Sequence, residues 1–197
     1  SGIISDNQGR SSGLVKSAAS SDYVKLNTTT VSSAVATVSI DGHFTSDYDY
    51  YNLYLTNVCP TADTQYYFRF NSGGSALTAS NYRNAVYTSY NKAGTHRLDS
   101  EKHGQYDSGY VALTVADSNN DLPLYGGVCG EIQIFQPLNA TPTPQFLSKC
   151  YATSNTGAQH HYCGGYYNVA GAISGITLYF PSQNTESGTF TLFGVKK

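Results

Sequence analysis

The chain has 197 residues, 12% of them charged, and a formal net charge of −2. That length is sufficient for one domain with a hydrophobic core. The small net charge excludes the basic surface that a nucleic-acid-binding protein needs to neutralise phosphates, so we expect no nucleic acid partner. The chain has 18 Tyr and neither Met nor Trp. Together with the abundant Ser, Thr, Asn and Gly, this composition favours strands over helices.

Membrane insertion is not expected, because no stretch approaches the ~18 to 20 consecutive apolar residues of a membrane-spanning helix. The N-terminus also lacks the charged and apolar regions of a secretory signal. We interpret Ser1 as the residue left after removal of an initiator Met.

Residues 1–20 form a segment rich in Gly and small residues, with two apolar pairs, Ile3 with Ile4 and Leu14 with Val15. Pairs this short bury little area within their own segment. We therefore predict an N-terminal arm that docks on another chain through these four side chains. A disordered tail and an arm that covers an edge of its own domain are the alternatives.

From residue 21 to residue 197 the dominant pattern is apolar and polar alternation with a period of two, which is typical of antiparallel strands. In 49–57, for example, Tyr51, Leu53 and Leu55 share one face. The predicted strands are 23–26, 35–40, 49–57, 66–70, 83–90, 111–115, 131–135, 146–152, 162–168, 173–180 and 189–195. Long connections are predicted at 71–81, at the charged window 91–108, and at 138–144.

No window carries the apolar stripe of an amphipathic helix, so we do not expect a helical crossover or a parallel sheet. The predicted fold is all-β: one antiparallel two-sheet sandwich over 21–197, jelly-roll-like, preceded by the short arm. The predicted core residues are Leu53, Leu55, Phe68, Phe70, Ile132, Ile134, Ile176, Leu178, Phe190 and Leu192.

The charged window concentrates residues that could act as acids, bases or metal ligands. They are His96, Arg97, Asp99, Glu101, His103 and Asp107. Their spacing matches no known triad or ligand motif, and a polar connection is the expected place for charge in this protein. No catalytic residue is therefore predicted there.

The four cysteines, Cys59, Cys129, Cys150 and Cys163, contain no CxxC pair. Free, half-buried thiols are the preferred interpretation, and two disulfides are the alternative. Cys150, Cys163 and the adjacent His160 and His161 do not have the spacing of a zinc motif. On a strand His160 and His161 would face opposite sides, with Cys163 on the side of His161. No metal site is predicted, although either histidine could line the axis of an oligomer.

Covalent and cofactor chemistry are not indicated. The chain has no GxSxG nucleophile elbow, and its Gly-rich turns lack the Lys and the helix of a phosphate-binding loop. No cofactor is predicted, and we expect a protein that is not an enzyme. A carboxylate pair assembled from distant strands, as in a glycosidase, stays open as the alternative.

The tyrosines outnumber what one core face requires, so some must be exposed or lie at interfaces. Tyr combines a large apolar ring with a polar tip, which suits both sugar stacking and protein interfaces. Tyr48, Tyr50, Tyr166 and Tyr167 are the candidate ligand or interface residues.

Three segments resemble small structural proteins of tailed bacteriophages, of the marine-phage type. The closing segments Ile173-Ser174-Gly175-Ile176-Thr177-Leu178-Tyr179-Phe180 and Thr189-Phe190-Thr191-Leu192-Phe193-Gly194-Val195-Lys196 are similar to the last strands of such virion proteins. Ser1-Gly2-Ile3-Ile4 with Ser12-Gly13-Leu14-Val15 looks like their N-terminal tag. Phe44-Thr45-Ser46-Asp47-Tyr48-Asp49-Tyr50-Tyr51, followed by the strand from Tyr66 to Phe70, is similar to their sheet core.

The resemblance implies a jelly-roll module that oligomerises, often as a trimer, and attaches to a phage capsid or neck protein through its arm. No catalytic residue carries over. We expect a virion protein that is assembled in the host cytoplasm and then becomes extracellular: a capsid decoration or head-appendage protein. The alternative is a tail fibre or tail-tip module that binds a glycan on the host surface.

Overall fold

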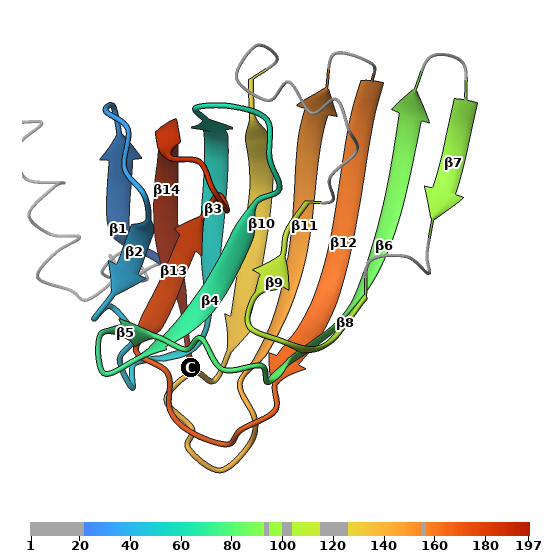
Figure 1. Ribbon diagram of the computed structural model, residues 1–197. Coiled ribbons are helices and arrows are strands. Elements are labelled where there is room, and N and C mark those ends of the chain that lie inside the picture. The colour runs from blue at the N-terminus through green and yellow to red at the C-terminus, as the bar shows by residue number, and fades with distance from the viewer. Residues whose placement is uncertain (1–21, 93–94, 100–103, 115–125, 155–156) are drawn as a thin grey trace, which may run out of the picture.

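The computed structural model describes residues 22–92, 95–99, 104–114, 126–154 and 157–197, and their regular structure consists of β-strands (Figure 1). The strands are β1 (Tyr23–Val31), β2 (Val38–Asp41), β3 (Tyr48–Pro60), β4 (Tyr67–Ser72), β5 (Ser75–Ala76), β6 (Tyr82–Lys92), β7 (Thr95–Asp99), β8 (Gln105–Ser108), β9 (Val111–Ala112), β10 (Val128–Phe135), β11 (Gln145–Ser154), β12 (Gly157–Tyr167), β13 (Gly175–Tyr179) and β14 (Thr185–Lys196). Among these described residues no helix is long and apolar enough to span a membrane.

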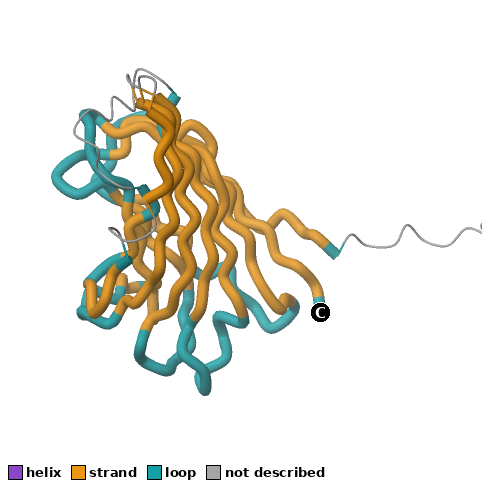
Figure 2. Tube along the Cα trace, turned by 90° about the vertical axis from the view of Figure 1, so that its right-hand side faces the viewer, coloured by secondary structure: helices purple, strands orange, loops and turns teal. Residues whose placement is uncertain are grey.

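The strands form two antiparallel sheets that pack as a sandwich. Sheet A has the order β1-β14-β3-β10-β11-β12-β6-β7, and β8 also pairs with β6. Sheet B has the order β2-β13-β4-β5, and β9 also pairs with β4. Figure 2 shows sheet B and its connections on one side of sheet A, and the described residues form no second sheet on the other side. Sheet A therefore has an inner face toward sheet B and an outer face away from it.

Eight of the strands follow jelly-roll connectivity. The chain runs from β1 to β2, β3, β4, β9, β10, β13 and β14, and every step crosses from one sheet to the other except that from β4 to β9, which lie side by side in sheet B. In space β1, β14, β3 and β10 lie side by side, opposite β2, β13, β4 and β9. This arrangement of two four-stranded sheets is that of a jelly roll. The predicted antiparallel sandwich with jelly-roll character is confirmed.

Two insertions widen sheet A beyond β10. The hairpin β11–β12 lies between β10 and β13 in the chain, whereas β6, β7 and β8 lie between β4 and β9. The two insertions meet in space, because β12 pairs with β6 from Gly157 opposite Lys92 to Tyr167 opposite Tyr82. Figure 1 shows these strands extending sheet A to one side of the jelly roll.

The core lies between the two sheets and contains all ten residues that the alternation predicted. Nine of them are 0% exposed and Leu55 is 2% exposed. Phe68 of sheet B packs edge-on against Phe146 of β11, with ring centroids 4.9 Å apart. Side chains of this size contribute about 1.5–3 kcal/mol each when buried. The sandwich is therefore held together mainly by apolar side chains of both sheets.

The charged window 91–108 was wrongly predicted as a connection, because it contains β7 and β8. β7 pairs with β6 and β8 pairs with the opposite end of β6. Short polar strands at a sheet edge give no apolar alternation, which explains why the sequence did not indicate them. The residues 138–144, with Pro142 and Pro144, are a connection as predicted.

Candidate binding surface

The outer face of sheet A is an ordered array of side chains, because the strand register places alternate residues of seven strands in common rows. One row, which we call the central row, crosses β3, β10, β11, β12 and β6. Its members are Tyr54, Glu131, Lys149, Tyr162 and Tyr87. On both sides of this row the neighbouring rows also carry aromatic and amide side chains.

Large apolar side chains are concentrated on this face. The described residues include eight exposed large hydrophobic side chains, and five of them lie here: Tyr23, Tyr54, Tyr87, Leu147 and Tyr162. Leu147, Tyr162 and Tyr87 are the most exposed, at 49%, 46% and 41%. All three come from the inserted strands β11, β12 and β6. The insertions thus supply exposed apolar surface as well as width.

The centre of the face is polar. Asn52 donates from Nδ2 to Oε2 of Glu131 at 3.0 Å, and Nζ of Lys149 lies 3.6 Å from Oε1 of the same carboxylate. The Glu131 side chain is 21% exposed, and that of Lys149 is 62% exposed. Asn52 stands at an outward position of β3 but is 95% buried.

At the jelly-roll end of the face three aromatic rings pack together. Tyr23 stacks on Phe193 with centroids 4.6 Å apart, and Tyr54 meets Phe193 edge-on at 5.7 Å. Partial burial of the Tyr23 hydroxyl raises its pKa, and the hydrogen bond with Tyr54 adds to this effect. The three rings form an apolar platform that carries the two phenolic hydroxyls of Tyr23 and Tyr54.

At the inserted end of the outer face, two neighbouring positions carry small residues, Gly164 and Ala85. Leu147 lies over Gly164, where an added Cβ would come within 2.8 Å of the leucine Cδ2. The next position in this row is Ala85, which is exposed. Tyr87 and Tyr162 stand one row away, with ring centroids 6.3 Å apart. Small residues thus lie directly beside two exposed rings.

At the edge of sheet A, Arg83 of β6 and Asp107 of β8 form an ion pair, with Nε 2.8 Å from Oδ1. Tyr106 lies under the Arg83 guanidinium at 4.3 Å from the ring centroid. The hydrogen bond with Asp107 is the main cause that raises the pKa of Arg83. Asp107 was a candidate of the charged window, and its described contact is this ion pair.

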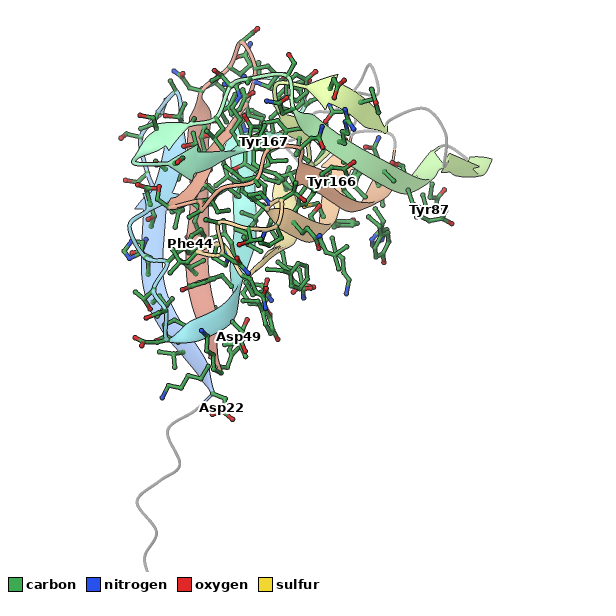
Figure 3. The ribbon with its side chains drawn as sticks, turned by 90° about the horizontal axis from the view of Figure 1, so that it is seen from below. Asp22, Phe44, Asp49, Tyr87, Tyr166 and Tyr167 are labelled. Atoms are coloured by element: carbon green, nitrogen blue, oxygen red, sulfur yellow. The ribbon has the colours of Figure 1, made fainter. Side chains whose placement is uncertain are left out.

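The tyrosines singled out from the sequence divide between the two faces. Tyr50 and Tyr166 lie on the outer face of sheet A, in the row that also holds Phe135 and Arg83. Figure 3 shows Tyr166 and Tyr87 on the side away from sheet B. Two of the four therefore belong to the candidate surface.

The other two pack inside the domain. Tyr167 is 6% exposed and packs on Tyr82, with ring centroids 4.8 Å apart, so its ring belongs to the core. Tyr48 is half-buried: its ring occupies the space above Gly194 and meets Tyr51 edge-on at 5.7 Å. It lines a shallow cavity at the end of the sandwich, together with Asp49 and Leu138.

The histidines and cysteines of β11 and β12 are arranged as the alternation predicted. His160 is exposed, whereas His161 is 1% exposed and lies on the inner face together with Cys163. His161 Nδ1 is 3.2 Å from the Thr88 hydroxyl, and its Nε2 is 3.2 Å from Oε1 of Gln159. Within the described residues no group of three or more His, Cys, Asp or Glu side chains is placed to hold a metal ion.

All four cysteines are free, in agreement with the preferred interpretation. Cys150 and Cys163 are buried, and burial raises the pKa of both thiols, that of Cys163 to about 11. Cys129 is half-buried, and its Sγ donates to Oδ1 of Asn57 at 3.2 Å. The thiols of Cys150 and Cys163 are therefore protonated and poorly nucleophilic at neutral pH.

Several sequence candidates lie outside the described residues. These are Ile3, Ile4, Leu14 and Val15 of the arm, with Glu101 and His103 of the charged window. The side chains of His96, Arg97 and Asp99 in β7 are likewise not described. The structure therefore leaves the predicted roles of these residues as predictions.

Sequence reasoning missed the central row. Each of its members stands at an outward position of an alternating strand, which was visible in the sequence. Their alignment also requires the strand order, and two insertions far apart in the chain bring β6 beside β12. Comparisons with family models, with curated proteins and with solved structures found no match.

Proposed function

We propose that the protein is a structural binding module of a bacteriophage particle, in the position of a capsid decoration or head-appendage protein. The observation that carries the proposal is the jelly roll with one sheet widened into an exposed aromatic face. Jelly rolls occur in viral capsid domains, lectins and cupins, so the fold alone does not select among these functions. A large exposed aromatic face favours a role in binding.

The position of the first strand supports attachment through the N-terminal segment. β1 is the edge strand of sheet A and pairs only with β14 among the described strands. Asp22, where the description begins, lies at one extremity of the domain (Figure 3). A segment that enters here could reach a particle while the outer face of sheet A stays accessible. We therefore assign the anchor to Ile3, Ile4, Leu14 and Val15.

A glycan-binding tail module is the second candidate. The observation in its favour is the pair of exposed rings, Tyr87 and Tyr162, beside the small residues Gly164 and Ala85. Tyrosine rings with neighbouring hydrogen-bonding groups are suited to stacking on a sugar.

The first experiment purifies the phage particles whose genome encodes this chain and examines them by mass spectrometry and immunogold electron microscopy. We expect several copies of the chain per particle, with gold on the head or neck. Gold at the tail tip would favour the second candidate. Purified particles that lack the chain would overturn both.

The second experiment adds purified chains to particles from which the gene has been deleted. The full chain should bind, and a chain that lacks residues 1–16 should stay folded but fail to bind. The matched control replaces Ile3, Ile4, Leu14 and Val15 with Ser in the full-length chain, which separates loss of the apolar side chains from loss of length. Normal binding by both variants would refute the anchor.

A further inference from the structure

We propose that the outer face of sheet A binds a second copy of the same chain, face to face, about a two-fold axis. The axis runs parallel to the strands, between β10 and β11, in the plane between the two faces. This inference goes beyond the proposed function and stands independently of it, because it concerns only how two copies of the chain associate.

The charges at the centre of the face are self-complementary about this axis. Glu131 and Lys149 lie directly opposite each other on β10 and β11, the two strands that flank the axis. Rotation by 180° places Glu131 of one copy in front of Lys149 of the other copy, and the reverse contact forms at the same time. An isologous interface requires such self-complementarity. Each carboxylate then has a lysine within its own chain and another across the interface.

One pair of side chains also differs in size in the way that two interlocking faces need. Strand order and register place the ring of Phe193 opposite the exposed Ala85 of the other copy. The axis makes this contact form twice, once on each side of the centre.

The same axis brings the tyrosines of the central row against residues of the other copy. Tyr54 faces Tyr162 of the other copy, and the exposed Tyr87 faces Thr191. The Tyr54–Tyr162 contact would bury two rings that are 38% and 46% exposed in the single chain. Buried tyrosines near the centre of an interface are typical of the residues that contribute most to binding.

The area of the face is sufficient for a stable dimer. Six strands of sheet A face one another across the axis, and at the usual spacing, with about eight residues along each strand, they give about 760 Å² on one copy, compared with about 800 Å² per partner in a standard interface. Twisted sheets pack with their strands within about 30° of each other, so two identical outer faces can form a second sandwich. The outer face of sheet A, which no described strand of its own chain covers, would be covered by the other chain.

The test is charge reversal with rescue. The full chain is examined by sedimentation equilibrium from 0.1 to 100 µM, together with Lys149→Glu, Glu131→Lys and the double variant. We expect a dimer for the full chain and at least hundredfold weaker self-association for each single variant, because like charges meet across the axis. The double variant restores opposite charges and should dimerise again. Asp47→Lys, a reversal at an exposed loop position, is the matched control and should remain a dimer.

Circular dichroism and thermal melting of every variant confirm that the chains are folded. Tyr162→Ser, which keeps the central charges, should also weaken the dimer. A monomer at 100 µM overturns the proposal, as does a dimer or trimer that Lys149→Glu leaves unchanged, or a double variant that stays monomeric.

A glycan array probed with the labelled chain adds one more outcome. Sugar binding by a monomer that Tyr87→Ser abolishes would assign the face to a glycan and refute the dimer. None of these outcomes depends on whether the chain belongs to a particle.

Discussion

The jelly-roll half of sheet A and its inserted half bury very different side chains on the inner face. In β3, β10 and β14 the inner positions hold aliphatic and aromatic residues such as Leu53, Ile132 and Leu192, all 0% exposed. In β12 and the paired part of β6 the inner positions include His161 and Thr88, which are equally buried. The first half is stabilised by apolar burial, and the second depends in part on specific hydrogen bonds.

This difference teaches how an insertion can enlarge a sheet without enlarging its core. Sheet B is much narrower than sheet A, so the inserted strands extend past it (Figure 1). Among the polar side chains there, His161 is paired with Thr88 and Gln159. A buried hydrogen bond contributes only about 0.5–1.5 kcal/mol net, but an unmade one is costly. We therefore expect the inserted half to be the less stable part of the domain.

The largest effect is expected for Leu178→Asp in sheet B, which packs on the jelly-roll half of sheet A. Leu178 of β13 is 0% exposed and lies between Val38 and Phe68 in the ladder. A buried, unpaired carboxylate costs several kcal/mol, which is comparable with the whole stability of a domain of this size. We expect no cooperative unfolding transition by circular dichroism. Leu138→Asp, at an exposed position, is the matched control, and a folded Leu178→Asp chain would contradict the assignment of the core.

A pair of cavity variants compares the two halves directly. Leu53→Ala in β3 should lower the free energy of unfolding by about 2–5 kcal/mol in urea titrations. Val86→Ala in β6 removes less volume beside polar neighbours, and we expect about 1–2 kcal/mol. Native-state hydrogen exchange should show the β6 amides opening at lower free energy than those of β3. Equal protection of the two strands would contradict the division of the sheet.

Alkaline pH should destabilise the inserted half through Cys163. Its pKa is raised from 9.0 to about 11 in the folded chain, so the folded state holds this proton more tightly than the unfolded state. The stabilisation is present below about pH 9 and is lost as the pH rises toward 11. Two pKa units correspond to about 2–3 kcal/mol. The fall in stability between pH 8 and pH 11 should be smaller by about this amount in Cys163→Val, and an identical fall would argue against a buried thiol.

The smallest effect on stability is expected at the exposed ion pair of the central row. Lys149→Ala removes a contact of 3.6 Å to Glu131 from a side chain that is 62% exposed. Such pairs contribute about 0–1 kcal/mol, so the urea midpoint of the monomeric state should barely change. A loss above about 2 kcal/mol would show that the pair supports the fold itself, in contrast to the role in association proposed for it.

The sequence predicted the jelly-roll half much better than the inserted half. Alternation placed Leu53 and Phe68 in the core, because each strand there buries one apolar face. The same alternation, extended from His161 and Cys163 to the end of β12, would have placed Tyr167 inside as well. The inner Thr88 and His161 carry no apolar signal, and the short strands β7 and β8 are polar. Their place in sheet A depends on long-range pairing that a local pattern does not encode.

The meeting of β1 and β14 at one corner of the domain has a consequence for chain order. Tyr23 pairs with Val195, and the amide of Lys196 donates to the carbonyl oxygen of Asp22 at 2.8 Å. A short linker could therefore join residue 197 to residue 22 without stretching either strand. New chain ends could be opened in the exposed connection around Thr141, which lies between β10 and β11. Such a circularly permuted protein would keep every ladder of both sheets, so the fold requires adjacency of its strands and not the order in which they are synthesised.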